Sequence, residues 1–143
     1  MRLNHDCLRD ILLCVEEHTG LRKSCSFVDV GLSGTSDFLG ASYCLREYQI
    51  LLQKKYENEQ LIYHVRYCLD AALIKGSNNG NVIQINDLTP EGHELLAKIR
   101  DPERWPKVKK AVSSIKDYSL SALSSIAEGI TSATINSYFF GVH

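Results

Sequence analysis

Histidine, cysteine and acidic side chains are the groups in this chain that could hold a metal ion. The sequence has five histidines and five cysteines, and the cysteines are Cys7, Cys14, Cys25, Cys44 and Cys68. No C-x-x-C pair occurs and no histidine pair has ligand spacing, so reduced, mostly buried thiols are expected. A cluster assembled only in the fold, from His5, His18, His64 or His93, stays open. No cofactor, metal ions included, is expected.

Two further stretches resemble catalytic or phosphate-binding patterns without completing them. Glu91 and His93 lie close together in Thr-Pro-Glu-Gly-His, but on the first turns of a predicted helix they are more simply structural contacts. The stretch Gly31-Leu-Ser-Gly-Thr35 lacks both the G-K-[S/T] ending and the G-x-G-x-x-G spacing. No nucleophile with a base stands out either. The chain is therefore not expected to be an enzyme, although a site assembled only by folding stays open.

The residues best suited to binding lie on one face of the predicted helix Asn58–Ile74. They are polar or aromatic, namely Gln60, Tyr63, His64, Arg66 and Tyr67, with Lys75 and Asn79 in the hairpin that follows the helix. Glutamine and arginine can read base edges and tyrosine can contact phosphate, so double-stranded DNA is one expected partner. Glu57 and Glu59 oppose this because they repel the DNA backbone. In the alternative interpretation, Tyr63 and His64 are packing residues and the lysines form a solvated face.

Composition and charge set limits on these partners. The chain has 143 residues, 44% of them hydrophobic, which is ordinary for one globular domain. Lys and Arg total 16 against 17 for Asp and Glu, so DNA binding needs a local basic patch. The N-terminus lacks the uninterrupted apolar core of a signal peptide, and about 18 consecutive apolar residues occur nowhere. A cytoplasmic protein without membrane contact is expected.

Hydrophobic periodicity predicts the elements that position the binding face. A helix is expected from Asn4 to His18, capped by Asn4 or Asp6 and ended by Gly20. A short strand, Cys25–Val30, and an exposed loop, Gly31–Ser42, come next. A second helix, Leu45–Tyr56, is expected to bury Leu45, Tyr48, Leu51 and Leu52. The third helix, Asn58–Ile74, has Asn58 as a plausible N-cap.

A β-hairpin is expected directly after that third helix. Asn79-Gly80 is a favoured type I′ turn pair, with strands of about Leu73–Lys75 and Val82–Asn86 on either side. Thr89-Pro90 then begins a helix, with Thr89 as its N-cap and Pro90 at its first position, and Asp101-Pro102 ends it. Trp105-Pro106 begins another helix that runs towards Lys116. A hairpin behind a helix is a wing, so the predicted fold is α+β of the winged helix-turn-helix type, mostly helical with C-terminal helices.

The C-terminal segment, residues 119–135, has an apolar stripe with almost no charged flank. The stripe and the aromatic tail that follows it supply the candidate contacts for a homo-oligomer or a partner, which are Leu120, Leu123, Ile126, Ile130, Phe139 and Phe140. An oligomer contact is favoured over a membrane surface. The expected division is a winged-helix-like domain, 1–101, and a C-terminal helical extension, 102–143.

Several landmarks together resemble domain-of-unknown-function family 2513. They run in order through nearly the whole chain and comprise Met1 to Leu13, Tyr63-His64, Leu69 to Ile74, Leu88-Thr-Pro-Glu-Gly-His93, Ile99-Arg-Asp101, Trp105 and Lys107-Val-Lys109. The resemblance implies a bacterial or prophage protein with winged-helix character and no assigned activity. The family usually has Gly at the position of Ala72 and often Trp at that of Pro90. It also passes more directly from the first strand to the central helix, so the stretch 31–56 is interpreted as an insertion.

Two functions therefore remain open for a non-catalytic binding protein of bacterial or phage origin. The first is a winged-helix DNA-binding or regulatory protein in the cytoplasm of a bacterial cell. The second is a protein-interaction module, for example a phage factor that modulates a host protein, which uses the same fold. Near-neutral charge and the apolar C-terminal segment slightly favour the second.

Overall fold

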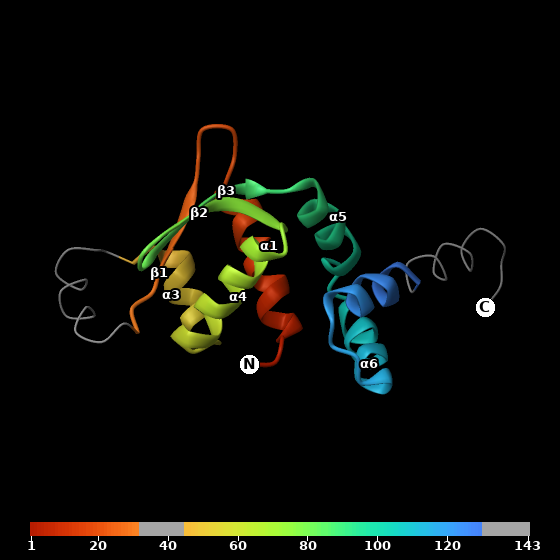
Figure 1. Cartoon of the computed structure of the whole chain (residues 1–143). Helices are drawn as coiled ribbons and strands as arrows, with labels where there is room; N and C mark the ends of the chain where they lie inside the picture. Colours follow the sequence, from red (N-terminus) through yellow and green to blue (C-terminus); the bar gives the residue numbers. More distant parts are fainter. Residues whose placement is uncertain (32–44, 130–143) are drawn as a thin grey trace.

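The computed structural model describes residues 1–31 and 45–129 (Figure 1). The helices in this part are α1 (His5–His18), α3 (Glu47–Gln53), α4 (Asn58–Asp70), α5 (Pro90–Ile99) and α6 (Trp105–Ile115), followed by helical residues 120–129. The strands are β1 (Cys25–Val28), β2 (Ile74–Asn79) and β3 (Val82–Leu88). They form an antiparallel sheet in the order β1-β3-β2. The predicted α+β class is confirmed.

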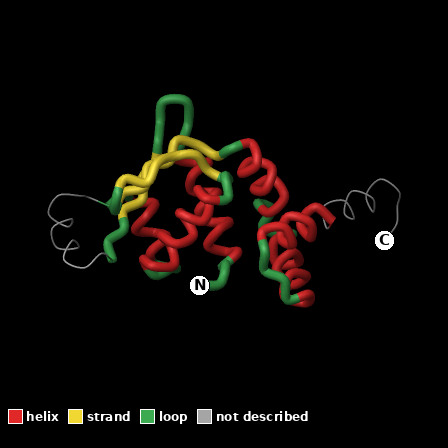
Figure 2. The backbone as a smooth tube through the Cα atoms, viewed as in Figure 1, coloured by secondary structure: helices red, strands yellow, loops and turns green. Residues whose placement is uncertain are grey.

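The main core lies between the sheet and the helices that cover one of its faces (Figure 2). Phe27 on β1 and the alternating Ile83 and Ile85 on β3 are fully buried against the apolar face of α1. Leu61 and Val65 of α4 complete this core. Each such aliphatic side chain contributes about 1.5–3 kcal/mol when it is withdrawn from water. The periodicity that predicted α1 and α4 therefore corresponds to their buried faces.

Among the described residues no strand lies beside the outer edge of β1, and α3 supplies its hydrogen bonds instead. The Gln49 side chain accepts from Val28 N–H (2.9 Å) and donates to Val28 C=O (2.7 Å). The Tyr48 hydroxyl accepts from Ser26 N–H (2.8 Å) and donates to Ser26 C=O (3.0 Å). An unpaired buried backbone group is costly, so these side chains hold α3 against the sheet.

This edge contact explains where the predicted second helix was wrong. The helix begins at Glu47 and buries Gln49, whereas Leu51, expected inside, is 53% exposed. A polar residue takes the inner position because the β1 edge needs a donor and an acceptor. The expected N-cap Asn58 is also corrected, because Glu57 is the N-cap of α4 and the Asn58 side chain binds Asp29 and Val30 instead.

The end of α4 is closed by two hydrogen bonds of the Schellman type. Ala72 N–H donates to Leu69 C=O (3.1 Å), and Leu73 N–H donates to Cys68 C=O (2.9 Å). This closure requires a left-handed residue, and Ala72 has φ of 58°. Glycine adopts this conformation without steric cost, so a glycine would fit this position better than alanine does.

The hairpin after α4 is longer than predicted. β2 reaches Asn79 and pairs it with Val82, so the two central turn residues are Gly80 and Asn81. Only Gly80 of these two has positive φ, at 68°. The expected type I′ turn is therefore wrong, because that turn needs positive φ at both central residues. Gly76 beside the β-bulge is also required, since a Cβ there would lie 2.0 Å from Gln84 O.

The C-terminal helices pack on α1 and extend the same hydrophobic cluster. Asp6 on α1 accepts from the Trp105 indole N–H (2.8 Å) and from Lys109, while Arg9 donates to the carbonyls of Ile99 and Arg100 at the end of α5. Thr89 caps α5 as predicted, by accepting from Gly92 N–H. α1 instead ends on an extended Thr19, not on Gly20. No helix among the described residues is both long and apolar enough to cross a membrane.

Gln49→Leu is expected to destabilise the protein by about 1–3 kcal/mol, because it leaves the buried N–H and C=O of Val28 without partners. Chemical denaturation monitored by circular dichroism measures the change. Gln84→Leu is the matched control, since the exposed Gln84 amide makes one long bond to Ser24. Equal effects of the two substitutions would contradict the role of Gln49.

Ala72→Gly is expected to raise the free energy of unfolding by about 0.5–1 kcal/mol, because glycine removes the left-handed strain and Ala72 is exposed. The same denaturation experiment applies. The neighbouring Ala71 has φ of −82°, so Ala71→Gly should lower stability instead. A loss of stability in Ala72→Gly would show that no strain is released there.

Candidate functional site

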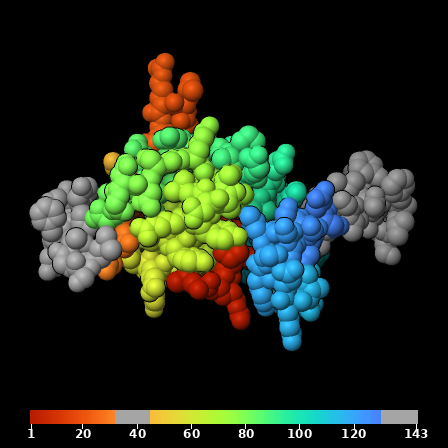
Figure 3. All heavy atoms as spheres, in the orientation of Figure 1, coloured from red at the N-terminus to blue at the C-terminus, as the bar shows by residue number. Residues whose placement is uncertain are grey.

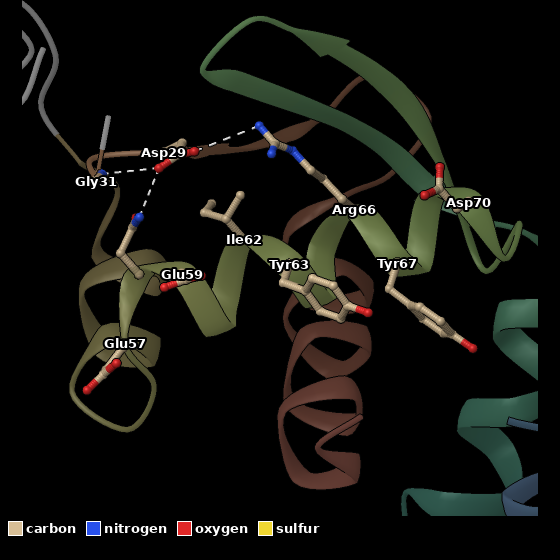
Figure 4. Close-up of a pocket in the computed structure, with 10 residues that line it drawn as sticks. Asp29, Gly31, Glu57, Glu59, Ile62, Tyr63, Arg66, Tyr67 and Asp70 are labelled. Atoms are coloured by element: carbon tan, nitrogen blue, oxygen red, sulfur yellow. Dashed lines mark hydrogen bonds and ion pairs between the residues drawn. The ribbon is translucent and has the colours of Figure 1, made fainter. Parts of the chain in front are cut away.

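A groove of about 760 Å³ runs along the exposed side of α4 (Figure 4). We call it the α4 groove. Its lining residues come from the end of β1 and from α4, and they are Asp29, Gly31, Glu57, Asn58, Glu59, Ile62, Tyr63, Arg66, Tyr67 and Asp70. The yellow-green surface of α4 lies uncovered near the centre of the face shown in Figure 3. The groove therefore lies on the helix that the sequence singled out for binding.

Asp29 joins the two sides of the α4 groove. Its Oδ1 accepts from Gly31 N–H (3.1 Å) and from the Asn58 side-chain amide (2.9 Å). Asn58 in turn accepts from Val30 N–H (3.1 Å). These bonds attach the exit of β1 to the first turn of α4, so the wall of the groove is held in place by hydrogen bonds.

Arg66 is the one cation among the lining residues that the structure describes. It extends towards Asp29, with 3.8 Å between Nη2 and Oδ2, and its side chain is 42% exposed (Figure 4). Its Nε is buried without a hydrogen-bond acceptor in the described structure. A long ion pair at a partly exposed site contributes little to stability. Arg66 is nevertheless turned towards Asp29 inside the protein, which reduces the positive charge that it offers to a ligand.

The lining residues are mainly acidic. Glu57, Glu59 and Asp70 are exposed, and Asp29 is buried at the β1 end. The two glutamates lie at the N-terminus of α4, where the helix dipole stabilises negative charge. Asp70 lies in the last turn, where the dipole opposes a carboxylate by about 0.3–1 kcal/mol. Helix stability thus accounts for the glutamates and does not account for Asp70.

Two tyrosines lie one turn apart on the same helix. Tyr63 is 40% exposed and Tyr67 is half-buried. Figure 4 shows both rings projecting from α4 to one side, while Arg66 points the other way towards Asp29. Residues separated by four positions are neighbours on a helix, so the rings form one aromatic surface on α4. Glu59 and Asp70 lie about one helical turn before Tyr63 and one turn after Tyr67, respectively.

The structure separates the other binding candidates from this surface. Lys75 and Asn79 are exposed on β2, and Gln60 is half-buried with its carbonyl accepting from the His64 ring. His64 is wrong as a ligand-reading residue because it is fully buried. Its Nδ1 lies 2.7 Å from Gln60 O and its Nε2 accepts from Asn4 N–H (2.8 Å), which fits a neutral ring that joins α4 to the start of α1.

The candidate contacts near the C-terminus are divided in the same way. Leu123 is fully buried in the chain's own core, so its predicted role at an oligomer interface is corrected. Leu120 and Ile126 are half-buried against that core. Ile130, Phe139 and Phe140 lie outside the described residues. The helical spacing was the same for an internal contact and an external one, so only packing could distinguish them.

Histidine, cysteine and acidic side chains are the groups in the described part of the chain that could hold a metal ion. No group of three or more metal-ligating side chains occurs there. Cys7, Cys14, Cys25 and Cys68 are buried and free, and burial raises the pKa of Cys7 and Cys14 to about 12, so their thiols stay protonated at neutral pH. Cys44 lies outside the described residues. Glu91 and His93 are both exposed on α5.

Sequence reasoning missed Asp29 and Asp70 as groove residues. Asp70 had a detectable signal, because a carboxylate at the end of a predicted helix opposes the dipole. Asp29 had none, since only the tertiary fold brings it to Asn58 and Arg66 of α4.

His64→Gln is expected to flatten the dependence of stability on pH. Burial lowers the pKa of His64 from its ordinary 6.5, so below that pH the unfolded chain binds a proton that the folded chain does not. Stability should therefore fall as the pH drops below 6.5, until the folded state also becomes protonated. Urea midpoints across this range test it, with exposed His93→Gln as the control. Identical pH profiles in wild type and His64→Gln would contradict the assignment.

Comparison with known proteins gives two matches. A family model described as "Hypothetical protein (DUF2513)" matches residues 2–119, which confirms the resemblance seen in the sequence. A protein of Haemophilus influenzae, named "Uncharacterized protein", is 28% identical over 137 residues that cover 92% of this chain and 97% of that protein. No solved structure matches the chain.

Proposed function

The chain belongs to the DUF2513 family of hypothetical proteins, and we propose that it is a winged-helix protein of the bacterial cytoplasm that binds another protein through the α4 groove. The relative in a bacterium and the groove described above support this proposal. Catalysis is not part of it, because the groove has no nucleophile paired with a base.

The order of elements supports the winged-helix part of the proposal. α1, β1, α3, α4, β2 and β3 follow one another, and β3 pairs with both other strands. α3 and α4 are joined by residues 54–57 in the manner of a helix-turn-helix, and β2 with β3 forms the wing. In this arrangement α4 is the helix that a DNA-binding relative of the fold would place in the major groove.

The charge of the α4 groove is the observation that carries the choice of partner. Three exposed carboxylates face outward, and Arg66 is turned towards Asp29. DNA presents closely spaced phosphates, which such a surface repels. Winged-helix proteins with the same backbone fold can bind proteins as well as DNA, so the fold does not require a DNA partner. A protein ligand fits this surface better than nucleic acid does.

DNA binding is the second candidate, and exposed cations near the wing favour it. Lys75 lies at the start of β2, and Arg22 and Lys23 lie on the loop that projects between α1 and β1 (Figure 1). Leu21, on the same loop, is 99% exposed. None of these three cations is among the residues that line the α4 groove, so they do not neutralise its carboxylates.

Fluorescence anisotropy with a labelled random duplex separates the two candidates. Wild-type protein is expected to show no salt-sensitive binding at low salt, because the carboxylates repel phosphate. The variant Glu57→Gln/Glu59→Gln/Asp70→Asn should bind the duplex more tightly than wild type does. The proposal would be overturned in favour of DNA by two results together. Wild-type protein would bind the duplex tightly, and this binding would be weakened by Arg66→Ala but not by Lys110→Ala on α6.

A photo-crosslinking amino acid in place of Tyr63 tests directly, in bacterial cells, whether the partner is a protein. We expect a crosslinked protein at position 63 and none at the matched exposed position Glu94 on α5. Crosslinks to nucleic acid from position 63 would count against a protein partner.

A further inference from the structure

The lining of the α4 groove indicates the chemistry of its ligand. Resting on the proposed function, we propose that the groove binds an arginine-rich peptide segment of the partner protein. The volume, the paired tyrosines and the position of Asp70 each support this assignment.

The size and openness of the groove fit a chain segment. About 760 Å³ lies within the range of sites that enclose a sizeable ligand, and the groove follows α4 from Glu57 to Asp70. An extended segment of a few residues can lie along such a helix and contact both ends. A single small ion would use only one end.

The aromatic surface selects the kind of cation. Tyr63 and Tyr67 project to the same side of α4 (Figure 4), and Glu59 and Asp70 lie about one helical turn before and after this pair. A guanidinium group is planar and weakly hydrated, so it stacks on a tyrosine ring while its N–H groups donate to a carboxylate. An ammonium group is a strongly hydrated point charge and gains less from such a surface.

Arg66 leaves the carboxylates of Glu59 and Asp70 available to a ligand. Arg66 extends towards Asp29 at the β1 end, on the side away from the two tyrosine rings (Figure 4). Asp29 also accepts from Gly31 and Asn58, so its charge is already engaged. Glu59 and Asp70 are exposed and remain for a ligand.

Asp70 distinguishes binding from folding. A carboxylate in the last turn of α4 weakens the helix, and the structure gives it no compensating cation in that turn. Asp70→Asn should therefore leave the protein as stable as wild type or more stable, while it lowers the affinity for the ligand. A residue kept for stability would show the opposite pattern.

The test is fluorescence anisotropy of the full chain with a fluorescein-labelled peptide of alternating arginine and serine, in about 0.15 M salt, where the Debye length is about 8 Å. The same peptide with citrulline in place of arginine is the neutral control. We expect binding of the arginine peptide alone. Asp70→Asn and Tyr67→Ala should each weaken it about threefold, and Glu59→Gln/Asp70→Asn about tenfold.

The matched protein control is Glu91→Gln/Glu94→Gln, which removes two exposed carboxylates from α5, outside the α4 groove. It should leave the peptide affinity unchanged. Equal weakening by this control and by Glu59→Gln/Asp70→Asn would overturn the site, because it would show general charge attraction. Equal binding of the citrulline peptide would overturn the arginine assignment.

Failure of this inference differs from failure of the proposed function. Absence of arginine-peptide binding, together with a protein crosslink at position 63, would reject the arginine-rich ligand and keep a protein partner. Nucleic-acid crosslinks at that position would reject the proposed function itself.

Discussion

The outer edge of β1 is the constraint on which the arrangement of the α4 groove depends. A short strand with a neighbour on one side leaves buried N–H and C=O groups on the other. Gln49 and Tyr48 satisfy them with side chains that act in place of a strand. This fixes α3 against the sheet, and residues 54–57 then determine where α4 begins. The position of the α4 groove follows from that start.

α4 packs one of its faces into the core and exposes another face to the α4 groove. Leu61, Val65 and Cys68 are buried in the core, and His64 on the same inner side bonds to the N-terminal segment. Tyr63, Arg66 and Tyr67 remain for the groove. The exposed polar face of α4 is therefore narrower than a helical wheel suggests, because the polar residue His64 is buried and hydrogen-bonded to Asn4. What remains outside is acidic and aromatic.

α1 connects the part of the protein that carries the α4 groove to the C-terminal helices. Asp6 and Arg9 lie on its surface and contact Trp105 and the last carbonyls of α5, respectively. Arg100 adds a pair of bonds to Glu16, at 2.9 and 2.8 Å. Charge-assisted bonds of this kind orient packed helices more than they stabilise them, since exposed pairs contribute little. Burial of Trp105, Val112 and Leu123 supplies the larger share of the docking energy.

The sequence by itself determined the family, the α+β class, the order of helices and strands, and the N-cap Thr89, because each depends on local spacing or on residues close in the chain. It also limited the N-cap of α1 to Asn4 or Asp6, and the structure selects Asn4. Only the tertiary structure decided that Gln49 is inside and Leu51 outside, that His64 is buried, and that Leu123 belongs to the core. It also brought Asp29 to Asn58 and so formed the groove. These outcomes depend on which backbone groups and apolar faces meet across the fold, and local periodicity carries no information about that meeting.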